Sequence, residues 1–124
     1  MQALNVVVAQ GDCVVAQFLA ASLHSYFQNI SVARSSEELR QLLARQRPDV
    51  AVVDLETVDM GEVCRLCSDF ALPVVTMHRI PDEKMWTSAL SAGASDCCDY
   101  HDLRNVVDAI GRSIPRKHRS TKAA

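Results

Sequence analysis

The sequence lacks any long apolar run and any leader-like N-terminus. Its continuous apolar stretches, such as Val50 to Val53, are far shorter than the roughly 20 residues that a membrane-spanning helix needs. The N-terminal run has no basic segment followed by a small-residue cleavage site, so we expect no signal peptide. These two absences predict a cytoplasmic protein without a membrane anchor.

An excess of charge of either sign is also lacking. Thirteen Lys and Arg residues face fifteen Asp and Glu residues, which gives a net charge of −2. This balance argues against a domain built mainly to bind nucleic acid. With 124 residues and a hydrophobic fraction of 48%, the chain has the size and composition of one globular domain that needs no disulfide or metal to build its core.

The five cysteines do not form a convincing disulfide framework, because their number is odd and Cys97 and Cys98 are adjacent. A reducing compartment fits this usage. Cys64 and Cys67 fall within a predicted helix, where core packing is favoured over a redox pair, and a shared zinc site with the adjacent pair is not expected. Since neighbouring strand residues face opposite ways, we expect one of Cys97 and Cys98 in the core and the other accessible.

Short apolar runs alternate with longer amphipathic segments along the chain. The runs predict strands at 4–9, 30–33, 50–54, 73–77 and 95–99, and the segments predict helices at 13–27, 35–46, 60–70, 82–92 and 101–114. Such alternation indicates an α/β domain over residues 1–114, with a parallel sheet covered by helices on both faces. Residues 115–124 are basic and predicted to be a disordered tail.

Polar residues gather where these strands end, which is the edge at which parallel sheets carry function. Gln10, Gly11 and Asp12 follow the first strand, and Asp54 ends the third. His78 and Arg79 follow the fourth strand, and Tyr100 follows the fifth. We find neither a nucleophile–base pair nor a glycine-rich phosphate loop, so an enzyme is not expected.

Three segments in this order resemble the receiver domain of bacterial two-component response regulators, of the chemotaxis-receiver type. They are "PDVAVVDL" (48–55), "LPVVTMHR" (72–79) and "SAGASDCCDY" (91–100). The resemblance implies a flavodoxin-like, three-layer (βα)5 sandwich with strand order 2-1-3-4-5. It also implies that Asp54 stands at the phosphoacceptor position.

The chain departs from this family at the other pocket positions. The family's pair of acids is matched by Gln10 and Gly11, with Asp12 one place late, where it would cap the first helix. His78 stands at the family's Thr or Ser position and Tyr100 at its lysine. Since Mg²⁺ prefers several carboxylate ligands, we expect weak metal binding at best, with Asp54, Asp12 and a backbone carbonyl near Glu56 as candidate ligands.

Without a metal or a lysine, a buried Asp54 needs another partner. One hypothesis is a charge-assisted bond from His78 or Arg79, which would fix the loops without phosphate. In the alternative, Asp54 caps a turn or meets solvent, and both basic residues point outward.

The aromatic residues Trp86 and Tyr100 mark the expected partner surface, built from the segments 82–92, 95–99 and 101–114. The resemblance implies a histidine kinase or a downstream effector as partner, and a homodimer through the same surface. The expected function is therefore phosphorelay signalling by an atypical receiver that acts through protein binding. Two alternatives remain: a working phosphoacceptor with a weak metal site at Asp54, Asp12 and Gln10, and a thiol redox sensor using Cys97, Cys98 or Cys13.

Overall fold

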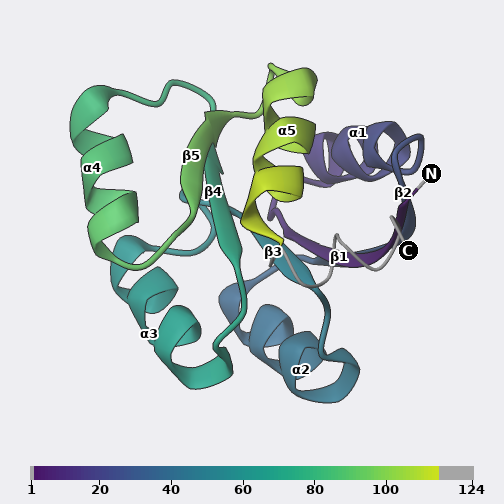
Figure 1. Ribbon diagram of the computed structural model, residues 1–124, viewed down its shortest axis with the longest axis horizontal. Coiled ribbons are helices and arrows are strands. Elements are labelled where there is room, and N and C mark those ends of the chain that lie inside the picture. Colours follow the sequence, from purple (N-terminus) through teal and green to yellow (C-terminus); the bar gives the residue numbers. More distant parts are fainter. Residues whose placement is uncertain (1, 115–124) are drawn as a thin grey trace, which may run out of the picture.

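The computed structural model describes residues 2–114 as five strands and five helices in strict alternation (Figure 1). The expected tail at 115–124 lies outside the described residues. The strands are β1 (Gln2–Ala9), β2 (Phe27–Ala33), β3 (Val50–Asp54), β4 (Val74–His78) and β5 (Asp96–Asp99). The helices are α1 (Cys13–Leu23), α2 (Ser36–Gln46), α3 (Met60–Phe70), α4 (Glu83–Ser91) and α5 (Leu103–Ser113).

The strands form one parallel sheet in the order β2-β1-β3-β4-β5. Helices α1 and α5 cover one face of this sheet, and α2, α3 and α4 cover the other (Figure 1). The predicted flavodoxin-like sandwich of order 2-1-3-4-5 is therefore confirmed.

The sequence of the central strand β3 is continuously apolar because both of its faces are buried. All five of its residues are buried. Val50 and Val52 enter the core beneath α1 and α5, whereas Ala51 and Val53 enter the core beneath α2, α3 and α4. Both faces of the strand are thus covered, and the only charged residue of the strand is Asp54, at its carboxyl end.

Polar caps begin the helices and fix where the loops end. The side chain of Ser35 accepts a hydrogen bond from the Glu38 amide, as the sequence predicts. Asp59, Asp82 and Asp102 cap α3, α4 and α5 in the same way. These caps set the loops that meet at the carboxyl edge of the sheet.

The first helix is shorter than the predicted segment 13–27. Helix α1 ends at Leu23, and Phe27 instead begins β2, where it pairs with Gln2. Because β1 starts earlier than expected, its partner strand must start earlier as well. Phe18 of this helix is 55% exposed.

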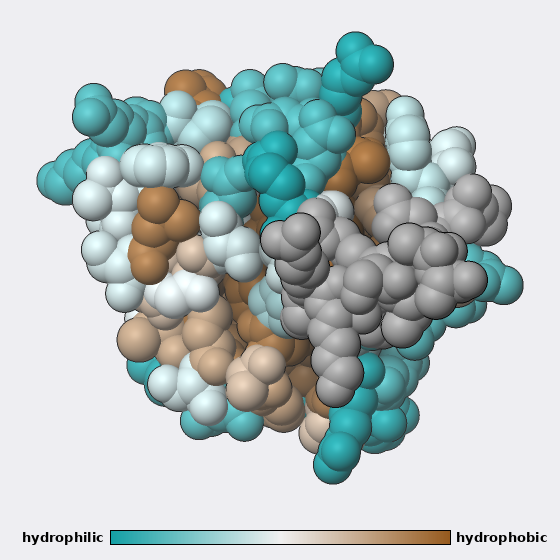
Figure 2. Space-filling model, viewed as in Figure 1, coloured by the Kyte–Doolittle hydropathy of each residue, from teal (hydrophilic) through white to brown (hydrophobic). Residues whose placement is uncertain are grey.

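On the face drawn in Figure 2, hydrophilic side chains gather at the top, and apolar side chains show in the middle, between α4 and α5, and at the lower left. Among residues 2–114, the longest helices have 11 residues, and none has the length and apolar character needed to cross a membrane.

Candidate functional site

A cleft of about 270 Å³ lies at the carboxyl edge of the sheet, where β1, β3, β4 and β5 end. It brings together seven of the eight pocket residues identified in the sequence, and His78 lies beside it. Val15 and Thr57 also line it, although nothing in the sequence pattern singled them out. The lining residues are Gln10, Gly11, Asp12, Val15, Asp54, Glu56, Thr57, Arg79 and Tyr100.

Asp54 is the acid at the centre of this cleft and is only 3% exposed. Its carboxylate accepts a hydrogen bond from the backbone N–H of Glu56 at 3.2 Å. Burial raises the pKa of this carboxyl above its ordinary value, against the lowering effects of the Glu56 amide and of the Gln10 side chain. The site therefore holds a carboxylate whose hydrogen-bond partners are neutral.

Gln10 occupies the position that follows β1 and is buried. Its side-chain Oε1 accepts a hydrogen bond from the Asp12 amide at 3.0 Å, and its backbone N–H donates to the Ala33 carbonyl at 2.9 Å. Because Oε1 already has a donor, the amide NH₂ is the part of Gln10 suited to face the Asp54 carboxylate.

Asp12 caps α1, as predicted. Its Oδ1 accepts hydrogen bonds from the backbone amides of Val14 at 2.9 Å and Val15 at 3.1 Å. The carboxylate thus satisfies two amides at the start of the helix, which is a structural role.

Gly11 follows Gln10 in the loop after β1, and its surroundings leave little room for a side chain. Its N–H donates to Thr57 Oγ1 at 2.8 Å, and its carbonyl accepts from Arg34 at 2.8 Å. A Cβ at Gly11 would lie 3.2 Å from Thr57 Oγ1 and 3.4 Å from the Arg34 carbonyl oxygen. The loop after β3 and the loop after β2 are therefore packed against this glycine.

The predicted bond between Asp54 and a basic residue of the β4 end is wrong. Arg79 Nε lies 3.1 Å from Glu56 Oε1, and His78 Nε2 lies 3.8 Å from the same oxygen. Within residues 2–114, no hydrogen bond or ion pair joins Asp54 to either base. The physical reason is that Glu56, at 41% side-chain exposure, offers a carboxylate outside the buried strand end.

A hydrogen bond from the backbone fixes the ring of His78. The Ile80 amide donates to His78 Nδ1 at 3.1 Å, so in the neutral ring the proton is assigned to Nε2, which faces Glu56.

Thr76, two residues earlier, is fully buried, and its hydroxyl donates to the Asp96 carbonyl at 3.0 Å. That hydroxyl is thus engaged in the sheet interior.

Tyr100 directly follows β5 and is held by its backbone N–H, which donates to the His78 carbonyl at 3.2 Å. Burial raises the pKa of its phenol, and the neighbouring charges of Asp54 and Glu56 add to this effect. The cleft therefore contains a neutral phenol where β5 ends.

The residues of the cleft do not match the ligand set that Mg²⁺ prefers. Within the described chain, no three His, Cys, Asp or Glu side chains are grouped as a metal site. Asp54 offers a carboxylate, but Gln10 Oε1 and Asp12 Oδ1 already accept backbone hydrogen bonds. The lining of this cleft therefore does not fit a Mg²⁺ site built from several free carboxylates.

The cysteines differ from the expected arrangement. Cys64 is exposed and not in the core, whereas Cys67, one turn later in α3, is partly buried and packs against the core beneath α2, α3 and α4. Cys97 and Cys98 are both buried, since β5 is covered on both faces. Burial raises the pKa of both thiols, that of Cys98 to about 12, which disfavours the thiolate needed for redox chemistry.

Trp86 lies on the surface formed by α4, β5 and α5, which we call the α4–β5–α5 face, and is 45% exposed. Its Nε1–H donates to Asp96 Oδ1 at 3.2 Å, and Arg112 donates to Asp96 Oδ2 at 2.8 Å. Asp96 thus ties both helices to the strand between them. The indole is fixed in orientation while part of its ring stays open to solvent.

No protein-family model matches the chain. A curated relative, the transcriptional regulatory protein AfsQ1 of Streptomyces coelicolor, is 28% identical over 116 residues, which are 91% of this chain. The chain spans about half (52%) of that relative's length.

Solved structures share the fold more completely. A receiver domain of a Francisella response regulator aligns with a TM-score of 0.78 at 18% identity, covering 88% of this chain and 94% of its own. A response regulator of Thermotoga maritima gives a TM-score of 0.78 at 19% identity, covering 90% of this chain and 98% of its own. A signal receiver domain of an HD domain-containing protein from Pseudomonas fluorescens gives a TM-score of 0.78 at 17% identity, covering 90% of this chain and 94% of its own. The chain therefore has the fold that these proteins share.

Proposed function

We propose that this chain is a receiver-type module of two-component signalling that acts by binding a protein partner, with little or no Mg²⁺-dependent phosphorylation of Asp54. The fold, the likeness to a transcriptional regulator and the position of Asp54 at the end of β3 support the receiver assignment. The atypical chemistry rests on the content of the cleft.

The observation that carries the proposal is the set of groups around Asp54. Phosphoryl transfer depends on positioning and on charge stabilisation of the phosphoryl oxygens. In this cleft the hydrogen-bond partners of the acceptor are the Glu56 amide and the Gln10 side chain, both neutral. The guanidinium of Arg79 is paired with Glu56, and Tyr100 carries no positive charge. An incoming phosphate would therefore meet little compensation for its charge.

The same contacts support a fixed arrangement of the loops. Thr57 binds the Gly11 amide, and Glu56 binds Arg79, so the loop after β3 is tied to the ends of β1 and β4. These bonds require no ligand. A module of this kind would present the same binding surface to its partner whether or not phosphate is available.

The α4–β5–α5 face is the surface we assign to the partner, which would be a histidine kinase, a downstream effector or a second copy of the chain. Trp86 provides an aromatic anchor whose orientation is set by Asp96. Tyr100 lies between this face and the Asp54 cleft.

The proposal is tested by incubating the protein with acetyl phosphate, with and without Mg²⁺, and recording the intact mass. We expect no gain of a phosphoryl group under conditions that label an ordinary receiver run in parallel. Asp54→Asn is the matched control. A Mg²⁺-dependent gain that the Asn variant lacks would contradict the proposal and favour the phosphoacceptor alternative.

A further inference from the structure

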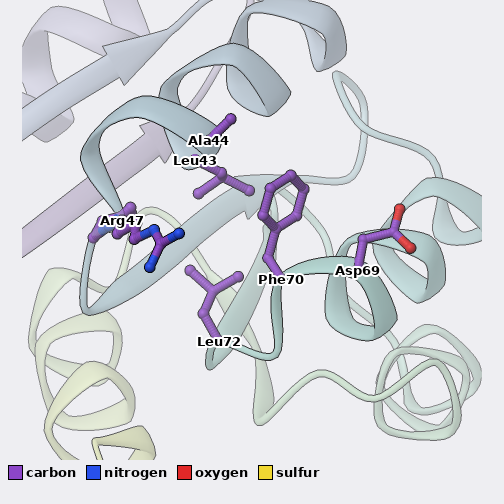
Figure 3. Close-up of a pocket in the computed structure, with 7 residues that line it drawn as sticks. Leu43, Ala44, Arg47, Asp69, Phe70 and Leu72 are labelled. Atoms are coloured by element: carbon purple, nitrogen blue, oxygen red, sulfur yellow. The ribbon is translucent and has the colours of Figure 1, made fainter.

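A second cleft lies at the opposite, amino edge of the sheet, where α2 and α3 end. It has a volume of about 450 Å³ and is lined by Leu43, Ala44, Arg47, Pro48, Asp69, Phe70 and Leu72. Figure 3 shows that Leu43, Phe70 and Leu72 surround a common space. The volume falls within the range of about 300–1,000 Å³ that is typical of small-molecule sites.

Arg47 supplies a cation at the rim of this cleft. It follows α2 in the left-handed region with φ 49°, a conformation that residues with a Cβ rarely adopt. In Figure 3 its guanidinium is directed toward the space beside Leu43 and Leu72. In the described part of the chain, this guanidinium forms no hydrogen bond or ion pair, so its donors are available to a ligand.

The acid of the cleft does not neutralise Arg47. Asp69 Oδ2 pairs with Arg40 at 3.0 Å, and its carboxylate points away from Arg47 in Figure 3. Phe70 separates the two, and Arg40 lies 5.8 Å from the centre of its ring. The cleft therefore combines an apolar floor with one unpaired guanidinium.

The geometry points to a binding site for a small organic carboxylate with a flat apolar body, such as an arene carboxylate. The guanidinium fork matches a carboxylate in a bidentate arrangement, and one cation balances one negative charge. The leucines and Phe70 would cover the ring. This site lies at the other edge of the sheet from Asp54, and the inference does not depend on the proposed function.

The test uses 1-naphthoate and its neutral analogue 1-naphthalenemethanol as probes, with affinities from amide chemical shifts. We expect the shifts at Ala44, Phe70 and Leu72, and about tenfold tighter binding of the carboxylate than of the alcohol, because the charged hydrogen bonds form only with the anion. Arg47→Asn should abolish this preference and leave alcohol binding unchanged, since Asn tolerates the left-handed conformation. Arg47→Lys should retain most of it.

Ala44→Trp gives an independent variant, because this exposed position lines the cleft and the indole would fill it. It should abolish binding of both probes without unfolding the protein. The inference is overturned if the two probes bind the unmodified protein equally, if neither binds, if the shifts lie at the Asp54 cleft, or if Arg47→Asn keeps the preference for naphthoate.

Discussion

Asp54 and Glu62 are both buried acids, at 3% and 9% exposure, yet their environments act on them in opposite directions. Burial raises the pKa of Asp54. Glu62, in the first turn of α3, receives hydrogen bonds from Arg40 Nε at 2.7 Å, Arg65 Nε at 2.8 Å and the Ser36 hydroxyl at 3.2 Å. These partners, Arg40 first, lower the pKa of Glu62 to about 2 in spite of its burial.

The difference shows that charged partners can outweigh the effect of burial on the pKa of a carboxylate, whereas neutral partners at the more deeply buried Asp54 do not. The Glu62 carboxylate has two guanidinium groups, and α2 and α3 are joined by them. The Asp54 carboxylate has an amide N–H and a neutral side chain. The ionised form of Glu62 therefore stabilises the fold. The ionised form of Asp54 instead costs free energy of folding, which is typical of a group kept for function and not for structure.

The largest effect is expected from Glu62→Gln, which removes the negative charge between the two arginines. At about pH 7 it should lower the free energy of unfolding by roughly 2 kcal/mol, because charge-assisted hydrogen bonds become neutral ones. The folded pKa lies below the unfolded value, so this contribution is present above about 4.5 and is lost as the pH falls toward about 2. Urea unfolding at several pH values measures it.

Glu37→Gln is the matched control for this prediction. Glu37 is exposed in the first turn of α2, and its substitution should change stability by less than about 0.5 kcal/mol. A loss at Glu62 that is the same at pH 7 and at acidic pH would show that the comparison with Asp54 is wrong for this residue.

Asp54→Asn should change the free energy of unfolding in the opposite direction to Glu62→Gln and by a smaller amount. Removing a charge whose folded pKa is raised should increase the free energy of unfolding by about 1 kcal/mol near pH 7. The ionised form is disfavoured in the folded state. The gain in the free energy of unfolding should therefore vanish below the ordinary pKa of 3.8, grow as the pH rises from there to the raised folded pKa, and stay constant above it. Asp108→Asn, at an exposed position of α5, should change little. A loss of stability in Asp54→Asn would contradict the description of the cleft.

Glu56→Gln should have the smallest effect on stability, below about 0.5 kcal/mol, because Glu56 and Arg79 are both substantially exposed. Its informative effect is on Asp54. The negative charge of Glu56 contributes to raising the pKa of Asp54, so that pKa should fall in the variant. Glu83→Gln, on an exposed turn of α4, provides the control. An unchanged Asp54 pKa in Glu56→Gln would mean that the two carboxylates do not interact.

Much of the fold could be predicted from local patterns in the sequence. The buried run of β3 and the cap at Ser35 each carry their signal within a few residues. The end of α1 could not be found this way, because Phe27 suits either the helix face or a strand. Phe27 becomes part of a strand because it pairs with Gln2, which is far away in the sequence, at the start of β1.

The site was predictable only in part, for a similar reason. Residues at strand ends must meet at one edge, so Gln10, Asp54 and Tyr100 could be assigned together. The pairing of Glu56 with Arg79 and the bond from Gly11 to Thr57 depend on the path of the loop after β3, which has no signature in the sequence. The arginine pair at Glu62 likewise depends on how α2 and α3 pack.

The most direct test is a carboxyl ¹³C NMR titration of the protein that follows Asp54 and Glu62 in the same samples, with and without millimolar Mg²⁺. We expect a raised Asp54 pKa, above 3.8, a Glu62 pKa of about 2, and no displacement of the Asp54 signal by the metal. An Asp54 pKa at or below its ordinary value, or one that Mg²⁺ lowers, would contradict the claim that this cleft holds its acid without a cation.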